Sequence, residues 1–97
     1  MIVVADSSPL IAFSRIGKID LLDELFGEIT IPDAVYDELT TGGHKFSHGW
    51  IKRKGVNDKN LVKILNAKLD RGESEAIALA IEINADILIM DEKPGSR

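Results

Sequence analysis

The chain has 97 residues, which suits one folded domain whose single core buries roughly 60–65% of the unfolded surface. It contains no cysteine, so disulfides, zinc–thiolate sites and catalytic thiols are excluded and a cytoplasmic protein is expected. No apolar run approaches the roughly 20 residues of a membrane-spanning helix, and no basic segment precedes the first apolar residues, so we expect neither a membrane span nor a secretory signal.

The net charge of −4 is unevenly distributed along the sequence. Residues 43–71 hold eight basic residues against Asp58 and Asp70, a local charge of +6, which leaves −10 on the remainder. The basic residues are Lys45, Lys52, Arg53, Lys54, Lys59, Lys63, Lys68 and Arg71. This asymmetry fits a basic rim beside an acidic pocket, but solvated helix faces and a charged loop would give the same pattern.

The first predicted element is a strand over residues 2–5, because its run of apolar residues is continuous and rich in Ile and Val, as in a strand covered on both faces. A helix follows, for which Ser8 is the expected cap and Pro9 lies in the first turn. Gly17 is expected to end this helix. Residues 18–26 then give a second short helix whose acids face solvent.

The next predicted elements are a short strand over residues 28–31 and a helix that begins at Pro32 and is stopped by glycines. The segment 49–56 is compatible with either an edge strand or a loop. A helix follows Asp58, with Leu61, Leu65 and Leu69 on one face. Another helix follows Gly72, in which Ala76, Ile77, Ala80 and Ile83 are the buried candidates and Asn84 closes the end, and residues 87–90 form the last strand.

Strands that alternate with helices of this length predict an α/β fold of three layers, with a mainly parallel sheet between helices. Asp6 and Asp91 each follow a predicted strand directly. Functional crevices of such folds lie at the carboxyl ends of the strands. If the two strands are neighbours, the two carboxylates lie within a few ångströms of each other, although Asp6 alone has the simpler explanation of turn or cap chemistry.

Two further acids are placed by helix geometry. Glu38 borders the expected core stripe of Val35 and Leu39, whereas Asp37 points away. Glu73 and Glu75 lie roughly 200° apart around a helix, so both cannot face one point. A charge that complements the helix dipole is the simpler explanation of Glu75.

Carboxylates brought to about 4 Å repel by about 4 kcal/mol per pair at an effective dielectric near 20, so a cluster of them requires a cation. The short motifs "VVADSS", "YDEL", "GESEAIALA" and "DILIMDE" contain no lysine or arginine. Oxygen donors alone favour Mg²⁺ or Mn²⁺ as the cofactor. Ser7 and Ser8 are auxiliary candidates that would orient a carboxylate or a metal-bound water.

These motifs resemble those of the PIN domain family, over residues 2–93 and in the same order: "VVADSSPLIAF", "IPDAVYDEL" and "RGESEAIALAIEINADILIMDEK". The resemblance implies a metal-dependent ribonuclease in which Asp6, Glu38, Glu75 and Asp91 are catalytic and bind the metal, with Glu73 auxiliary. It also implies single-stranded RNA as substrate, a homodimer and, in toxin–antitoxin pairs, an antitoxin protein as partner. The family pattern normally continues through a helix, a strand and another helix, whereas here "EKPGSR" follows Asp91, so the C-terminal strand and helices are expected to be missing.

In such a site the acids hold the metal and the attacking water, and basic residues guide the RNA. Lys52, Arg53, Lys54 and Arg71 are the candidate nucleic-acid contacts, with Trp50 as a stacking surface.

Three alternatives compete with this hypothesis. His44 and His48 have a zinc-like spacing, but glycines surround them and a third ligand is lacking. Asp6 in "DSS" would suit a phosphate-accepting aspartate, but residue 8 is serine rather than the second acid of phosphatases. The third alternative is a PIN-like module that binds nucleic acid or protein without cleavage, which the short C-terminal end favours.

Overall fold

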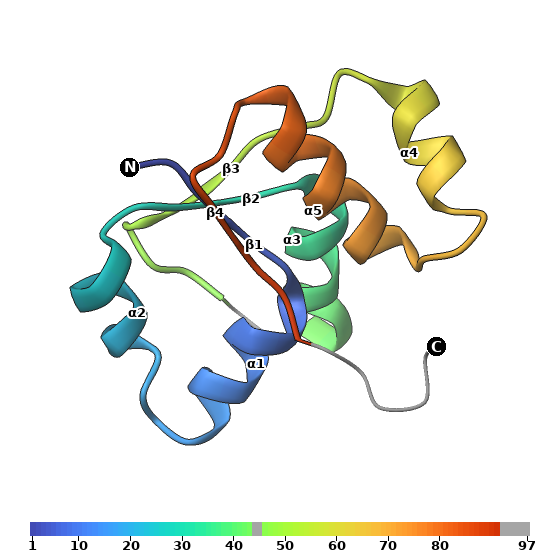
Figure 1. Ribbon diagram of the computed structural model, residues 1–97. Helices are drawn as coiled ribbons and strands as arrows, with labels where there is room; N and C mark the ends of the chain where they lie inside the picture. Colours follow the sequence, from blue (N-terminus) through green and yellow to red (C-terminus); the bar gives the residue numbers. More distant parts are fainter. Residues whose placement is uncertain (44–45, 92–97) are drawn as a thin grey trace.

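The computed structural model describes residues 1–43 and 46–91 and shows helices on both faces of a sheet (Figure 1). In this part of the chain the strands are β1 (Val3–Ala5), β2 (Ile29–Ile31), β3 (Ile51–Arg53) and β4 (Ile87–Ile89). The α-helices are α1 (Ser7–Arg15), α2 (Asp20–Phe26), α3 (Asp33–Thr40), α4 (Lys59–Leu65) and α5 (Arg71–Glu82), and Thr41–Gly43 forms a short 3-10 helix. The predicted α/β fold of three layers is confirmed.

The strands of the described chain run parallel in the order β3-β2-β1-β4. Val4 of β1 lies opposite Leu88 of β4, so the two strands that precede Asp6 and Asp91 are neighbours, which the sequence left open. β3, for which the sequence left strand and loop open, pairs with β2 at the edge of the sheet. Because the strands are parallel, the carboxyl ends of all four described strands lie at the same end of the sheet.

Two apolar clusters fill the spaces between the layers. The first packs α1, α2 and α3 against one face of the sheet, through the buried residues Val3, Ala5, Leu10, Leu22, Ile29, Ile31, Val35 and Leu39. The second packs α4 and α5 against the other face, through Val4, Val56, Val62, Ala76, Ala78 and Leu79. The alternation of Val3, Val4 and Ala5 between the clusters explains why β1 is apolar at every position.

Helix α4 is shorter than its leucine repeat suggests. It ends at Leu65, and Leu69, the third leucine of the predicted stripe, lies in the turn that follows. Backbone N–H groups of Lys68 and Leu69 donate to the carbonyl of Leu65, so a tight turn takes up the chain where the repeat predicted another helical turn.

Helix α5 starts earlier and buries other residues than predicted. It begins at Arg71 and is capped by Asp70. Ala76 is buried as expected, but the most enclosed apolar side chains also include Ala78 and Leu79, because α5 packs against both α3 and α4 as well as against β1. Asn84, with φ of 53°, closes the end as predicted. None of the helices in residues 1–43 and 46–91 is both long and apolar enough to span a membrane.

Candidate active site

Asp6 is the first residue after β1 and the N-cap of α1. Its backbone N–H continues the β1–β4 ladder by donating to the Ile89 carbonyl at 2.9 Å, and its Oδ1 accepts from the Ser7 N–H at 2.8 Å. The predicted cap at Ser8 is wrong by two residues, because the aspartate carboxylate accepts from the free first-turn N–H. Ser8 instead lies half-buried in the first turn. The side chain of Asp6 is thus fixed at the carboxyl end of a central strand, and the residue is only 4% exposed.

Ser7 connects this strand end to α3. Its hydroxyl donates to Glu38 Oε1 at 2.6 Å, which holds the Glu38 carboxylate next to Asp6 although most of the Glu38 residue is exposed. The same carboxylate lies over Gly72, where an added Cβ would come within 3.0 Å of both oxygens and the carboxyl carbon. The Glu38 carboxylate therefore lies between Ser7 and Gly72, in a position that depends on a hydroxyl and on the missing side chain of the glycine, and its role in the site stays a prediction.

The pKa of the Asp6 carboxyl is raised above its ordinary value of 3.8. Burial is the main cause, and the negative charges of Glu38, Asp70 and Glu73 add to it, whereas the hydrogen bond from the Ser7 N–H acts in the opposite direction. Four carboxylates from three segments, the end of β1, helix α3 and the start of α5, therefore share one electrostatic environment at the strand ends.

Asp70 and Glu73 form a capping box at the start of α5. The Glu73 N–H donates to Asp70 Oδ1 at 2.8 Å, and the Asp70 N–H donates to Glu73 Oε1 at 3.2 Å. Sequence reasoning missed Asp70, although an acid three residues before Glu73 is the ordinary signature of such a box. Glu73, expected only as an auxiliary residue, is the acid of this motif whose charge acts on Asp6.

Glu75 lies elsewhere on α5. It is 8% exposed, its Oε1 accepts from the Ala34 N–H at the start of α3 at 3.0 Å, and its Oε2 lies 3.5 Å from Nε of Arg71. Arg71 also approaches Asp37 Oδ2 at 3.4 Å, so Asp37, expected to point away, faces the start of α5. Arg71, directly before the "GESEAIALA" motif, thus places a positive charge beside the carboxylates of Glu75 and Asp37. From the sequence, a metal ion alone was expected to neutralise the acids.

Asp91 follows β4 and is exposed. In the parallel register Ala5 lies opposite Ile89, so Asp6 is level with residue 90 and Asp91 lies one residue further along. The condition that the two strands are neighbours is met, and a close Asp6–Asp91 pair stays a prediction.

A family model for PIN domains, DUF3368, matches residues 2–97. The chain belongs to the PIN domain family. No curated protein and no solved structure shows a significant match to the chain. PIN domains are generally nucleases that use divalent metals, which agrees with carboxylates gathered at the carboxyl ends of a parallel sheet.

The donors of the PIN domain site suit a hard divalent cation in kind. Asp6 and Glu38 offer carboxylate oxygens on either side of Ser7, and Mg²⁺ is commonly held by one or two carboxylates with several waters. In the described parts of the chain, no three His, Cys, Asp or Glu side chains are grouped to hold one ion. The site therefore fits an ion bound through two carboxylates rather than one enclosed by four.

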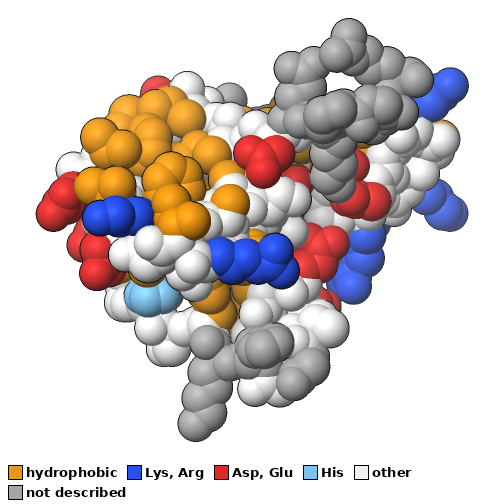
Figure 2. All heavy atoms as spheres, turned by 90° about the horizontal axis from the view of Figure 1, so that it is seen from below, with side chains coloured by type: hydrophobic (Ala, Val, Ile, Leu, Met, Phe, Trp, Pro, Cys, Tyr) orange, Lys and Arg blue, Asp and Glu red, His pale blue; other side chains and the backbone are white. Residues whose placement is uncertain are grey.

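The predicted nucleic-acid contacts lie at two places in this PIN domain. Lys52 and Arg53 belong to the edge strand β3, with Lys54 directly after it, and Arg71 lies among the acids. Arg53 pairs with Asp33 at 2.8 Å and lies 4.3 Å above the ring of Tyr36. Seen from below, the surface shows acidic and basic side chains next to one another (Figure 2).

Trp50 and His48 form part of an aromatic group on the loop before β3. The ring of His48 lies 5.0 Å from Phe46 and 5.4 Å from Trp50 between centroids. Trp50 is half-buried against the first apolar cluster, and the other candidate histidine, His44, lies outside the described residues.

Proposed function

We propose that this PIN domain is a Mg²⁺- or Mn²⁺-dependent endoribonuclease that hydrolyses phosphodiester bonds in single-stranded RNA. The observation that carries the proposal is the Asp6 carboxylate, which lies at the end of a central strand with its pKa raised mainly by burial and further by neighbouring acids. A buried anion among like charges is costly unless a cation joins it. A perturbed carboxyl at a strand end is also a common property of catalytic sites.

Asp6 and Glu38 would hold the ion, because Ser7 fixes both of their carboxylates. When bound, a divalent ion lowers the pKa of its water and neutralises charge on the phosphate. The N–H of Ser7 holds Asp6 Oδ1 and its hydroxyl holds Glu38 Oε1, which keeps one oxygen of each carboxylate in place. Ser7 is therefore a positioning residue for both acids.

Glu73 adds negative charge near the Asp6 carboxyl and would help to attract the cation. Glu75 supports the site from outside by joining α5 to the start of α3. Asp91 remains a candidate ligand from β4. Lys52, Lys54 and Arg71 would attract the RNA backbone through charge.

The test is cleavage of an end-labelled single-stranded RNA with Mn²⁺ or Mg²⁺, beside EDTA. Asp6→Asn should abolish cleavage and Asp23→Asn, at an exposed acid of α2, should leave it unchanged. Cleavage that persists in EDTA or in Asp6→Asn would refute the proposal.

A binding module without catalytic activity is the second candidate. It is supported by the contacts of the Glu75 carboxylate with the Ala34 N–H and with Arg71, which would compete with binding of a metal ion by that acid. Folded protein that binds RNA but does not cut it in either metal would favour this candidate.

A toxin role, with an antitoxin protein as partner, and a homodimer are proposals that follow from the family. Exposed apolar side chains on and beside α1 and α2 are compatible with a protein contact: Ile16, Leu21 and Leu25. Figure 2 shows apolar side chains gathered at one side of the face seen from below. Light scattering of the purified protein would give its oligomeric state.

A further inference from the structure

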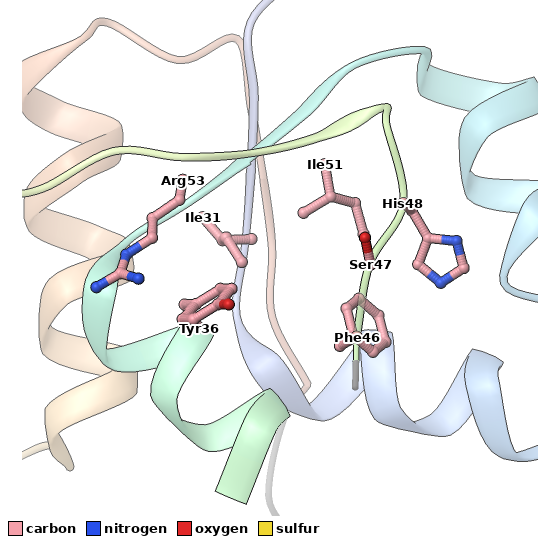
Figure 3. Close-up of a pocket in the computed structure, with 7 residues that line it drawn as sticks. All are labelled: Ile31, Tyr36, Phe46, Ser47, His48, Ile51 and Arg53. Carbon is pink, nitrogen blue, oxygen red and sulfur yellow. The ribbon is translucent and has the colours of Figure 1, made fainter. Parts of the chain in front are cut away.

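A cavity that is separate from the acidic site lies between the edge strand β3 and the loop that precedes it. Its volume is about 180 Å³, and it is lined by Ile31, Tyr36, Phe46, Ser47, His48, Ile51 and Arg53. Tyr36 and Phe46 lie on opposite sides of it, with Ile31 and Ile51 projecting from the strands (Figure 3). None of these residues takes part in the acidic site.

We propose that this cavity binds a nucleobase of the single-stranded RNA, a few nucleotides from the phosphate held at Asp6. The inference rests on the proposed function for its class of substrate. It adds a recognition site that the acids do not supply, because phosphate and metal contacts carry no base preference.

The size and lining of the cavity suit a planar ring. An apolar cavity of about 150 Å³ binds benzene, so about 180 Å³ accommodates an aromatic ring with polar edges. Tyr36, Phe46 and His48 provide ring faces, and base–aromatic stacking is the usual way in which proteins hold single-stranded RNA. Ser47 and the Tyr36 hydroxyl supply hydrogen-bonding groups for the edge of a base.

Charge favours a nucleotide over an apolar side chain of a protein. Arg53 lies at the rim, half-exposed and 4.3 Å above the Tyr36 ring, with Lys52 and Lys54 on either side in the sequence. Its guanidinium would meet a phosphate that flanks a bound base. The pairing of Arg53 with Asp33 fixes this guanidinium over the Tyr36 ring.

The position of the cavity also fits a substrate that reaches the acids. Arg53 is the last residue of β3, and it lies at the same carboxyl end of the sheet at which Asp6 follows β1. The strand β2 lies between them, so the two strand ends are roughly 10 Å apart at about 4.8 Å per strand. One RNA strand can therefore contact both places.

Binding is testable without catalysis, because the only tryptophan, Trp50, lies beside His48. Ribonucleoside monophosphates, titrated in EDTA, should quench its fluorescence saturably, whereas ribose 5-phosphate should not. Tyr36→Leu should weaken binding by about tenfold or more, and Tyr36→Phe, which keeps the ring, by much less. Phe13→Leu, on α1 away from the cavity, is the control.

Equal quenching by ribose 5-phosphate, or unchanged affinity in Tyr36→Leu, would overturn the inference, as would binding of a short aromatic peptide in preference to nucleotides. Should Tyr36→Leu not fold, an RNA hexamer with one abasic position, compared with the intact hexamer on the wild-type protein, gives the same test. Nucleotide binding without RNA cleavage would refute the proposed nuclease and keep the cavity assignment. RNA cleavage without base-dependent binding would support the proposed nuclease and refute the cavity assignment.

Discussion

The Glu75 carboxylate on α5 caps the first turn of α3 by accepting a hydrogen bond from the Ala34 N–H at 3.0 Å. A helix leaves its first N–H groups without partners, and here a side chain from a different helix satisfies one of them. Glu75 thus joins α3 and α5, which pack against opposite faces of the sheet.

Glu75→Ala should lower the free energy of unfolding by about 1–3 kcal/mol, because it leaves the buried Ala34 N–H without an acceptor. Glu75→Gln should lose less than half as much, because the amide oxygen still accepts that bond. Urea denaturation of both variants gives the comparison, with Asp23→Ala as an exposed acidic control. Equal losses in the two Glu75 variants would show that charge, rather than the hydrogen bond, provides the stabilisation.

Asp6→Asn should make the protein more stable at neutral pH. The pKa of Asp6 is raised in the folded state, so between 3.8 and that higher value the folded protein binds more protons than the unfolded chain. Stability therefore falls as pH rises through this range, and the full penalty is present above it. Asparagine removes the penalty and keeps the oxygen that accepts from Ser7.

The measurement is the urea midpoint of wild type and Asp6→Asn, at about pH 7 and about pH 4 in EDTA. The gain should be largest at the higher pH and shrink as Asp6 becomes protonated, while Asp23→Asn should show no such trend. A variant less stable than wild type at neutral pH would show that Asp6 is stabilising as an anion.

The positions of β1, β2 and β4 and of the carboxyl-end acids were predictable from the sequence, because they depend on local patterns, whereas β3 was left open between strand and loop. A continuous apolar run indicates a strand that is covered on both faces, and the residue that follows such a run lies at the carboxyl end of that strand. Glu38 was predictable for a similar reason, because its place beside Val35 and Leu39 follows from helical spacing.

The partners of the acids were not predictable in this way. Glu75 meets Ala34 across 41 residues of sequence, and the Ser7–Glu38 bond spans 31. Such contacts depend on how α1, α3 and α5 pack, which no local period records. The role of Asp70, by contrast, was present in the sequence as a capping box with Glu73.

Mn²⁺ should raise the melting temperature of the wild type, because an ion that binds only the folded state stabilises it. The shift should be lost in Asp6→Asn and in Glu38→Gln, the two proposed ligands. It should persist in Glu75→Gln, because Glu75 contacts Ala34 and Arg71 instead. Thermal melts with and without Mn²⁺ decide the point, and loss of the shift in Glu75→Gln would restore Glu75 to the ligands.

Gly72→Ala should separate stability from activity. Gly72 lies in the first turn of α5, where alanine is favoured over glycine by up to about 1 kcal/mol. The new Cβ would come within 3.0 Å of the Glu38 carboxylate, whose flexible end can move aside at little cost. That movement breaks the bond from Ser7 and takes Glu38 away from Asp6.

The expected result is a urea midpoint that changes little or falls slightly, because the gain from alanine only partly offsets the lost Ser7–Glu38 bond, together with RNA cleavage reduced by about tenfold or more, since misplaced catalytic groups are costly. Gly49→Ala is the matched control, because a Cβ there meets no atom within 4 Å, and it should leave cleavage unchanged. Full activity in Gly72→Ala would show that Glu38 does not need its place beside Ser7, and Asp6 would then have to hold the ion with another acid.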